Sequence, residues 1–424
     1  MAVSLYLCAL CDTVCWAFDP VRLYQEKIAF ISVSIMAYTR KIAVNTRLLL
    51  KDKMDGIGYF TYETLMRIVR RNPDIEFHFL FDRPYDPMFV FGDNVVPVVL
   101  FPPSRHPFLW YWWFDWSVAG YLNKNKFDLF LSPDGYCSLR SSTPTVAVMH
   151  DIAYEHYPDY VPWMTMKYYK YFMPRFAKHA KRIATVSEYS KADIVKYYGV
   201  SPDKIDVVYS AAKDNFEPAT TEERDAIRTK YSDGKPYLIF VGSIHPRKNL
   251  KNMLLAFDAH RKTRPDSVLK FIVAGAFGWQ NSELKSIIDN MQYKADVIFL
   301  GRQPLDELAR LIAGAFALLY LSVFEGFGVP PLEAMRSRVP AITSPISSLP
   351  EISGDGALYA DPLNPTAIGD AITSLWDSPS LRKDLIGKGA VRARRFTWDR
   401  TATLLWDCCL KALGPIQPSP KGKA

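Results

Sequence analysis

Short apolar runs separated by helix-length segments dominate the hydrophobic pattern of this chain. In the first half the runs lie at residues 41–49, 75–81, 95–101, 127–133, 145–150, 182–187 and 205–210. In the second half they lie at 237–243, 269–275, 296–301, 316–322, 339–345 and 357–361. Unbroken apolar runs of this length are typical of strands buried on both faces, and their alternation with helices indicates parallel sheets. We therefore predict two parallel α/β sheets in succession.

The two sheets define the expected domain organisation. At 424 residues the chain is too long for one ordinary core. The expected parts are an N-terminal extension outside the fold, a first Rossmann-like domain, a polar linker without apolar period, a second Rossmann-like domain, a C-terminal helix and a disordered tail, at 1–35, 36–213, 214–236, 237–395, 396–413 and 414–424.

Composition narrows the class of protein. Hydrophobic residues make up 49% and charged residues 23%, which is typical of a globular protein. No stretch reaches the roughly 18 apolar residues of a membrane span. The net charge of +8 fits an acidic ligand or an anionic membrane surface without choosing between them. Six cysteines form no disulfide framework, and Cys8, Cys11 and Cys15 have no second ligand cluster, so we expect a cytoplasmic protein without a structural metal.

The stretch SVFEGFGVPPLEA at 322–334 carries the strongest chemical signal. It follows a predicted strand, so Glu325 should lie in the loop where that strand ends. Gly326 and Gly328 allow backbone N–H groups to approach a ligand closely. The prolines that follow suit the start of a helix, and a helix N-terminus binds phosphate.

Glu333 should lie in the first turn of that helix. A glutamate there usually complements the helix dipole, which is the alternative for Glu333 taken alone. Glu325 and Glu333 together, eight positions apart, flank the expected phosphate site with hydrogen-bond acceptors. The combination suits a phosphate with a sugar on each side, which is a nucleotide sugar.

Arg247 and Lys248 follow another predicted strand, at the start of a helix. Adjacent cations are costly in that position unless an anion lies beside them, although in most proteins such a pair is simply solvated. Cations that face the departing oxygens of a diphosphate would lower the barrier to sugar transfer. The sequence contains no Asp-x-Asp pair of the kind that holds a divalent metal in many transferases. We therefore expect a metal-independent mechanism.

The string E-G-F-G-x-P-x-x-E-A from Glu325 to Ala334 resembles the signature of the family 4 retaining glycosyltransferases, and G-S-x-x-P-R-K-N at 242–249 resembles their diphosphate-binding motif. The similarity extends from about residue 40 to 412 and is nearest to the mannosyltransferase B-like group. It implies the GT-B fold, in which two Rossmann-like domains with parallel sheets face a central cleft and a C-terminal helix crosses back to the first domain.

The resemblance also implies a function. It implies retaining transfer of a hexose, with mannose as the best guess, from a GDP- or UDP-linked donor. The acceptor would be a glycan or a lipid-linked oligosaccharide in the synthesis of a cell-surface polysaccharide such as lipopolysaccharide, with no cofactor, no metal and no nucleic acid. The expected location is the cytoplasm, with peripheral contact to the anionic inner membrane face as an option.

Individual roles follow from the same resemblance. The residues expected to act in catalysis are Arg247, Lys248, Glu325 and His150, with Glu325 on the donor sugar. The residues expected to bind the donor are Glu333, Gly326, Phe327, Gly328, Val329, Ser243, Gly56, Gly58 and Asp151, with Glu333 on the ribose. Gly56 and Gly58 match only part of a dinucleotide fingerprint, whereas His150 and Asp151 end a strand, where α/β sheets bind ligands.

Two segments keep alternative interpretations. The aromatic stretch at 108–116 either packs on the sheet or forms an acceptor-facing or membrane-facing surface. The aromatic and basic stretch at 167–182 is either a solvated helix face or a site for an anionic leaflet. Ser187 is interpreted as a structural helix cap.

Two other functions stay open at this point. One is another GT-B enzyme, an epimerase or a phosphorylase, and the other is a catalytically silent scaffold that binds a sugar nucleotide. The sequence also departs from the family pattern at Leu321, where proline is frequent, and at Arg338, where glycine is usual.

Overall fold

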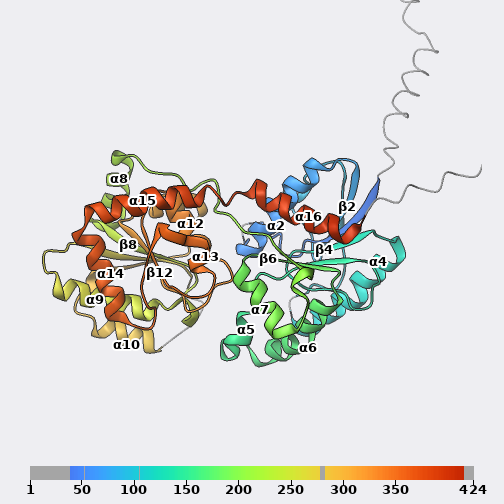
Figure 1. The fold of residues 1–424 in the computed structure, drawn as a ribbon, viewed down its shortest axis with the longest axis horizontal. Helices are drawn as coiled ribbons and strands as arrows, with labels where there is room; N and C mark the ends of the chain where they lie inside the picture. Colours follow the sequence, from blue (N-terminus) through green and yellow to red (C-terminus); the bar gives the residue numbers. More distant parts are fainter. Residues whose placement is uncertain (1–38, 52, 105, 277–281, 415–424) are drawn as a thin grey trace, which may run out of the picture.

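The structure is a computed structural model that describes residues 39–51, 53–104, 106–276 and 282–414. The expected extension at 1–35, with its three cysteines, lies outside the described residues, as does the tail beyond Gly414. The described chain forms two α/β bodies side by side, with the second half of the chain on the left and the first half on the right in Figure 1.

The first half of the chain forms a seven-stranded sheet in which the described pairs are parallel, in the order β3-β2-β1-β4-β5-β6-β7. Its strands are β1 (Arg40–Asn45), β2 (Ile75–Phe81), β3 (Val95–Val99), β4 (Leu129–Ser132), β5 (Thr145–Val148), β6 (Arg182–Thr185) and β7 (Ile205–Val207). All four residues of β4 are buried, which explains why this strand appears in the sequence as an unbroken apolar run.

Helices cover both faces of this sheet. They are α2 (Gly56–Arg71), α3 (Pro107–Trp112), the π-helix η2 (Trp113–Val118), α4 (Ala119–Asn125), α5 (Ala153–His156), α6 (Trp163–His179) and α7 (Glu188–Tyr198), with short 3-10 turns η1 (Pro87–Phe89), η3 (Pro158–Tyr160) and η4 (Pro202–Lys204). The neighbouring β1 residues Ala43 and Val44 belong to different hydrophobic clusters. Val44 shares its cluster with α2, whereas Ala43 shares its cluster with η2, α6 and α7.

The second half forms a six-stranded parallel sheet in the order β10-β9-β8-β11-β12-β13. Its strands are β8 (Tyr237–Val241), β9 (Lys270–Ala274), β10 (Val297–Gly301), β11 (Ala317–Tyr320), β12 (Ala341–Thr343) and β13 (Ala357–Tyr359). The helices are α9 (Leu250–Thr263), α10 (Ser282–Asn290), α11 (Leu305–Gly314), α12 (Val329–Arg336), α13 (Leu349–Ser353), α14 (Pro365–Asp377) and α15 (Pro379–Ala393), with turns η5 (Pro246–Lys248), η6 (Lys294–Asp296) and η7 (Gly354–Gly356). The prediction of two parallel sheets is confirmed.

The segment at 214–236, which the sequence identifies as a polar linker, contains helix α8 (Thr221–Ser232). Thr220 and Glu223 form a capping box at its start, and Arg228 Nε donates a hydrogen bond to the Gly314 carbonyl at 3.0 Å. Ser232 is the one buried residue of this helix, so the sequence has no apolar period there.

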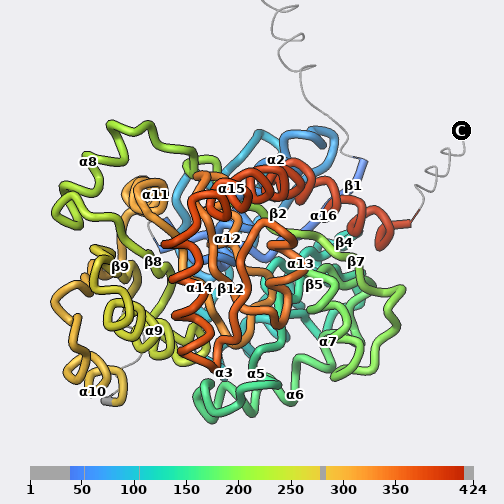
Figure 2. The backbone as a smooth tube through the Cα atoms, turned by 60° about the vertical axis from the view of Figure 1, so that its left-hand side comes forward, coloured from blue at the N-terminus to red at the C-terminus, as the bar shows by residue number. Residues whose placement is uncertain are grey.

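Helix α16 (Trp398–Leu413) leaves the second body and lies across the first, where Figures 1 and 2 both place it beside α2. Its Thr401 hydroxyl donates to the Tyr209 carbonyl at 2.7 Å, and Lys411 Nζ lies 2.5 Å from Asp206 Oδ1. Leu405, Cys408 and Cys409 are fully buried in the same cluster as β1 and β2. The crossing helix implied by the resemblance is therefore present.

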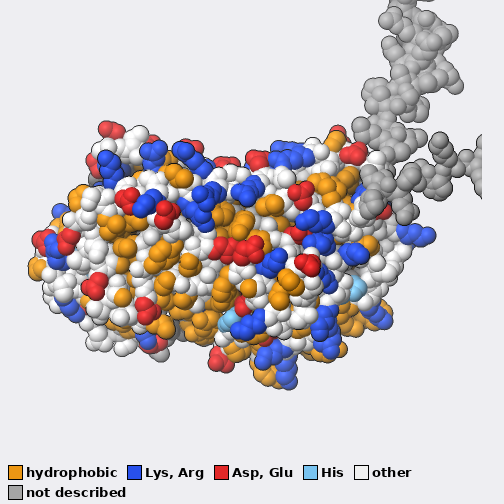
Figure 3. All heavy atoms as spheres, in the orientation of Figure 1, with side chains coloured by type: hydrophobic (Ala, Val, Ile, Leu, Met, Phe, Trp, Pro, Cys, Tyr) orange, Lys and Arg blue, Asp and Glu red, His pale blue; other side chains and the backbone are white. Residues whose placement is uncertain are grey.

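None of the helices in the described ranges is both long and apolar enough to cross a membrane. Figure 3 shows Lys and Arg side chains over both bodies on the face that it presents.

Candidate active site

Glu325 forms a three-membered ion group with the predicted cations. Its Oε2 lies 3.2 Å from Arg247 Nη1, and its Oε1 lies 2.5 Å from Lys248 Nζ. Glu325 is 6% exposed and follows β11, whereas the two cations follow β8, the neighbouring strand of the sheet. The parallel arrangement brings the carboxyl ends of both strands to one edge, where α/β sheets bind ligands.

The charges decide the protonation of Glu325. Burial alone would raise the pKa of this carboxyl group, but the cations of Lys248 and Arg247 overcome that effect and lower the pKa to about 2. Glu325 is therefore an anion at neutral pH. One carboxylate and two cations leave an excess of one positive charge at this edge of the second sheet.

Backbone contacts fix the two loops to each other. The Val323 N–H donates to the Arg247 carbonyl at 2.9 Å, and Arg247 Nη1 donates to the Phe324 carbonyl at 2.5 Å. From the sequence we expected the two cations at the start of the long helix, and this is not what the structure shows. They lie in the 3-10 turn η5. Asn249, with a φ of +57°, separates this turn from α9.

Gly326 is one of the points where the second body touches the first. A Cβ atom on Gly326 would lie 2.6 Å from the His150 carbonyl oxygen and 2.7 Å from Asp151 Cβ, so no larger residue fits without a shift. His150 and Asp151 follow β5 of the first sheet. The structure thus brings the candidate residues of both domains together at one contact.

Ser187 and Ser190 strengthen this contact, although the sequence indicated only a structural cap. Ser187 does cap α7, since its Oγ accepts from the Ser190 N–H at 3.0 Å. Both hydroxyl groups also lie within hydrogen-bond distance of the Gly326 carbonyl, at 2.7 and 3.2 Å. Nearby, the Glu188 N–H donates to the carboxylate of Glu351 in the second body at 2.8 Å.

His150 is held with a defined tautomer. Its Nε2 lies 2.8 Å from the Pro133 carbonyl, and a carbonyl only accepts, so Nε2 carries the proton. Burial lowers the pKa of His150, which makes the ring neutral at pH 7 and leaves Nδ1 as an acceptor. Phe60 of α2 packs edge-on against this ring, with 4.9 Å between the ring centroids.

Glu333 lies just beyond the first turn of its helix, in which the sequence placed it. Gly328, with φ +95°, is the N-cap, so α12 begins at Val329 and Glu333 is its fifth residue. Its side chain is 5% exposed, and burial raises its pKa to about 7 while the Lys213 cation offsets only part of this effect. Among the described residues, Lys213 acts only as a nearby charge, and none makes a hydrogen bond or salt bridge to this carboxyl group.

Three further residues that we expected to bind the donor differ in their surroundings. Ser243 is exposed at the end of β8. The Phe327 side chain is buried against Phe396, with ring centroids 5.8 Å apart. Any contact of Phe327 with a ligand would therefore come from its backbone. Gly328 lies so close to Leu349 that a Cβ atom would approach the Leu349 Cδ2 to 2.5 Å.

Gly56 and Gly58 both lie in the first turn of α2 and differ in their surroundings. The Gly58 N–H donates to the Asp55 carboxylate at 2.9 Å, and a Cβ atom there would lie 2.9 Å from the Leu48 carbonyl. Gly56 has no neighbouring atom within 4 Å of such a Cβ position. Packing therefore requires a glycine at 58, whereas position 56 is open.

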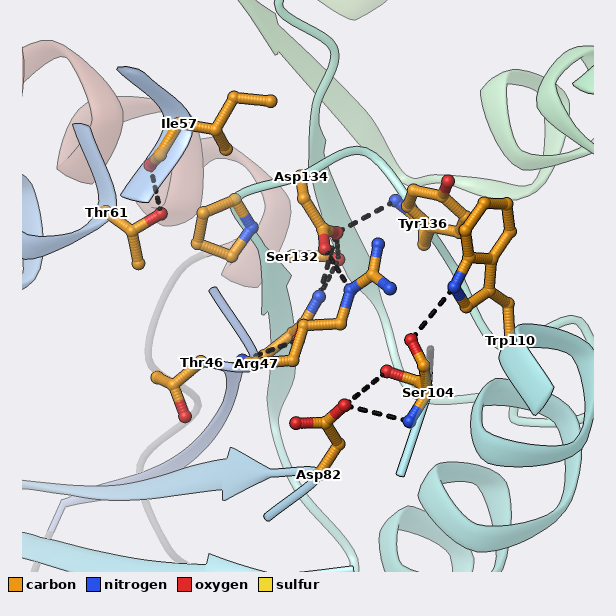
Figure 4. Close-up of polar contacts among 12 residues, drawn as sticks. Thr46, Arg47, Ile57, Thr61, Asp82, Ser104, Trp110, Ser132, Asp134 and Tyr136 are labelled. Atoms are coloured by element: carbon orange, nitrogen blue, oxygen red, sulfur yellow. Dashed lines mark hydrogen bonds and ion pairs between the residues drawn. The ribbon is translucent and has the colours of Figure 1, made fainter. Parts of the chain in front are cut away.

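The sequence did not single out Arg47, which we expected within a strand at 41–49. The structure ends β1 at Asn45, and Arg47 leaves the sheet to form a buried salt bridge with Asp134, 2.6 Å from Nε to Oδ2. Its guanidinium lies 4.4 Å from the Tyr136 ring centroid and 5.9 Å from that of Trp110 (Figure 4). Pro133 directly precedes Asp134, and its carbonyl accepts the hydrogen bond from His150 Nε2.

Within the ranges that the structure describes, no group of three or more histidine, cysteine, aspartate or glutamate side chains has a geometry suited to a metal ion. The arrangement supplies instead paired cations, buried acceptors and close backbone approaches. Such a set suits an anionic ligand that carries hydroxyl groups.

Known proteins share both the sequence and the fold. Residues 222–392 match the family described as glycosyl transferases group 1, and residues 54–213 match glycosyltransferase family 4. O-antigen chain mannosyltransferase B of Escherichia coli is 30% identical over 290 residues, or 68% of this chain and 74% of that relative. O-antigen chain mannosyltransferase RfbU of Salmonella typhimurium is 32% identical over 288 residues, or 68% of this chain and 76% of that relative.

The crystal structure of WaaG, a glycosyltransferase involved in lipopolysaccharide biosynthesis, has a TM-score of 0.68 with 14% identity, covering 86% of this chain and 98% of WaaG. That likeness shows the fold, which is GT-B as the resemblance implied. The sequence relatives go further, because they are matched over about three quarters of their length. This chain belongs to the family 4 glycosyltransferases and is similar to their mannosyltransferase B-like group.

Replacement of Gly326 by alanine should separate the two domains. The new Cβ atom would meet His150 and Asp151 at distances that real Cβ atoms do not show, so the contact must open. We expect a larger radius of gyration by small-angle X-ray scattering, with circular dichroism unchanged. Gly120→Ala is the control, because position 120 has open space around it. An identical scattering curve for Gly326→Ala would contradict this account of the contact.

The buried carboxyl group of Glu333 should make stability depend on pH. Its pKa rises from an ordinary value of 4.5 to about 7 in the folded chain, so its protonated form is favoured by folding. The contribution of Glu333 to the free energy of unfolding is therefore largest below pH 4.5 and should fall by about 3 kcal/mol as the pH rises to 8, since each pKa unit is about 1.4 kcal/mol. Glu333→Gln should lack this component when urea unfolding is compared across the range. Parallel pH profiles for the two proteins would refute the shifted pKa.

Proposed function

We propose that this enzyme transfers a hexose, with mannose as the best candidate, from a nucleotide diphosphate sugar to a glycan or lipid-linked acceptor with retention of configuration and without a metal. The observation that carries the proposal is the ion group of Arg247, Lys248 and Glu325 at the contact between the domains. The names of the two relatives with 30% and 32% identity favour mannose and O-antigen synthesis, and hence GDP rather than UDP as the nucleotide.

The two cations make the diphosphate a better leaving group. When the bond between the anomeric carbon and the phosphate oxygen breaks, negative charge develops on the diphosphate and positive charge develops on the sugar. Arg247 and Lys248 stabilise the first charge, because they are fixed before the substrate arrives. The diphosphate competes with Glu325 for these cations, which frees the Glu325 carboxylate to accept hydrogen bonds from donor-sugar hydroxyls.

Retention of configuration follows from the direction of attack. The acceptor hydroxyl attacks the anomeric carbon from the same face of the sugar as that from which the diphosphate departs, and its proton passes to a diphosphate oxygen. The neutral His150, with Nδ1 as an acceptor, is suited to a hydroxyl of the donor sugar and not to the role of a permanent cation. No separate nucleophile is required for this route.

Glu333 is the proposed ribose acceptor. A carboxyl group with a pKa of about 7 and no described partner gains hydrogen bonds when two ribose hydroxyls arrive. Those bonds favour its ionised form, so nucleotide binding should release part of a proton at neutral pH. Gly56, Gly58, Ser243 and Val329 are proposed to provide backbone or hydroxyl contacts to the same ligand.

The acceptor is proposed to lie against the first domain. Arg47, Asp134 and Asn45 provide hydrogen-bonding groups beside the His150 loop, and Trp110 and Tyr136 provide aromatic faces of the kind on which sugar rings pack (Figure 4). We also propose that the enzyme works in the cytoplasm with peripheral contact to the inner membrane face, where a lipid-linked acceptor would reside.

Replacement of Arg247 by alanine should lower kcat by about 10²- to 10³-fold, since it removes a cation that stabilises the departing diphosphate. The assay is the release of nucleoside diphosphate from GDP-mannose in the presence of acceptor. Arg310→Ala is the matched control, because Arg310 lies on the same domain and its side chain is 70% exposed. Equal loss in both variants, or normal turnover in Arg247→Ala, would remove Arg247 from catalysis.

Calorimetric titration with GDP and UDP, in the presence of a metal chelator, tests the proposed donor. We expect GDP to bind without metal and Glu333→Ala to weaken that binding by about 1.5 to 3 kcal/mol. Tighter binding of UDP would replace GDP as the donor nucleotide. Binding of neither by the folded protein would favour a phosphorylase or a silent scaffold, and turnover of the donor without acceptor into another sugar nucleotide would favour an epimerase.

A further inference from the structure

The N-terminus of α7 in the first domain is completed by a side chain from the second domain. The first N–H groups of a helix have no partner within it, so other groups must accept their hydrogen bonds. Ser187, the N-cap, accepts the Ser190 N–H at 3.0 Å. The Glu351 carboxylate accepts the other two, from the Glu188 N–H to Oε1 at 2.8 Å and from the Tyr189 N–H to Oε2 at 3.1 Å. The cap of α7 is therefore divided between the two domains.

A carboxylate that caps a helix ordinarily comes from the same segment of the chain. Glu223 is an example within this protein, since it accepts the Thr220 N–H at 2.8 Å at the start of its own helix, α8. Glu351 instead lies in α13, 163 positions away from Glu188 in the sequence. In Figure 1, α13 lies on the side of the second body that faces the first. The cap of α7 is therefore complete only while the two domains are in contact.

Contacts on both sides hold Glu351 in place. Within the second domain, Arg392 of α15 donates from Nη2 to the Glu351 carbonyl and from Nε to the Ile352 carbonyl, the latter at 3.0 Å. In the first domain, the carboxylate lies beside Tyr209, where burial and then the negative charge of Glu351 raise the pKa of the phenol to about 12. The Tyr209 hydroxyl therefore keeps its proton beside the carboxylate at neutral pH.

The segment that carries Glu351 also holds the loop of the ion group. Ser347 Oγ accepts the Glu325 N–H at 3.1 Å. Ser348, the N-cap residue of α13, lies with its Oγ 2.9 Å from the Glu325 carbonyl and 3.0 Å from the Phe327 carbonyl. A movement of α13 would therefore carry the loop of the ion group with it.

We propose that Glu351 is a positioning residue, which holds the first domain at the distance from the ion group that sugar transfer requires. It acts through α7, because the Ser187 hydroxyl at the start of that helix donates to the Gly326 carbonyl at 2.7 Å. Glu351 and Gly326 thus hold the same helix turn from the second domain. The inference rests on the proposed function, in which the cations that bind the diphosphate belong to the second domain and His150 belongs to the first.

Hydrogen exchange of the full chain tests the contact without any glycosyl transfer. The amide groups of Glu188 and Tyr189 have no acceptor within their helix, so their protection reports the bonds to Glu351. We expect Glu351→Ala to raise their exchange rates by at least about tenfold, because two hydrogen bonds to a charged group are lost. Mass spectrometry with fragmentation that resolves single residues is the measurement.

The control variant is Glu223→Ala. It removes the same kind of bond, from a backbone N–H to a carboxylate at a helix N-terminus, but within one helix. It should leave the exchange of the first turn of α7 unchanged.

Steady-state kinetics separate positioning from donor binding. Glu351→Ala should lower kcat with GDP-mannose and acceptor by about 10- to 100-fold, since small displacements of reacting groups slow transfer by this amount. The affinity for GDP, measured by calorimetry, should stay within about threefold of the native value, because Glu351 bonds to α7 and not to the ion group. Glu351→Gln retains the length of the side chain and one acceptor oxygen, so it should show a smaller loss of kcat and a smaller rise in exchange.

The proposal is overturned if Glu351→Ala and Glu351→Gln exchange Glu188 and Tyr189 at the native rates, or if Glu223→Ala raises these rates equally. It is also overturned if Glu351→Ala keeps full turnover, or if its GDP affinity falls as far as its kcat, since Glu351 would then belong to the donor site. A native chain that protects both amides but transfers no sugar would refute the proposed function and not the contact, so the two failures are distinguishable.

Discussion

The carboxylate of Glu325 between two cations is the interaction on which the rest of the site depends. It fixes the loop after β11 to the loop after β8, and three charges leave bulk water together in doing so. Because two cations share one carboxylate, the group keeps one uncompensated positive charge that an arriving anion can neutralise. The residue after Glu325 is Gly326, which touches the first domain. The ion group and this contact between the domains are therefore separated by a single peptide unit.

Much of the fold was predictable because the strands of parallel sheets buried on both faces appear in the sequence as unbroken apolar runs. The runs at 75–81 and 237–243 correspond to β2 and β8 with small changes at their ends. The predicted strand at 41–49 was too long, since apolar character continues past the last sheet hydrogen bond and does not mark where a chain leaves the sheet. Helix α8 was missed for the opposite reason, because it buries almost nothing and has no periodic signal.

The site was predictable as far as local sequence carries chemistry. The motifs located Arg247, Lys248 and Glu325, whose side chains the structure brings together. They did not reveal Ser187 as an interdomain contact or Arg47 as a partner of Asp134, because those pairings join residues far apart in sequence. The structure explains why glycine is usual at position 338, since Arg338 has a φ of +55°, a conformation that glycine adopts at little cost.

The crossing of α16 has a consequence for how the chain is made. This helix completes the hydrophobic cluster that covers β1 and β2, yet its last residue, Leu413, is synthesised more than 300 positions after β2. During translation this face of the first sheet, which α2 covers only in part, therefore stays incompletely covered until α16 has followed the second domain out of the ribosome. The order of the elements in the sequence thus places the last step in assembling the first domain at the end of synthesis, when α16 packs onto that domain.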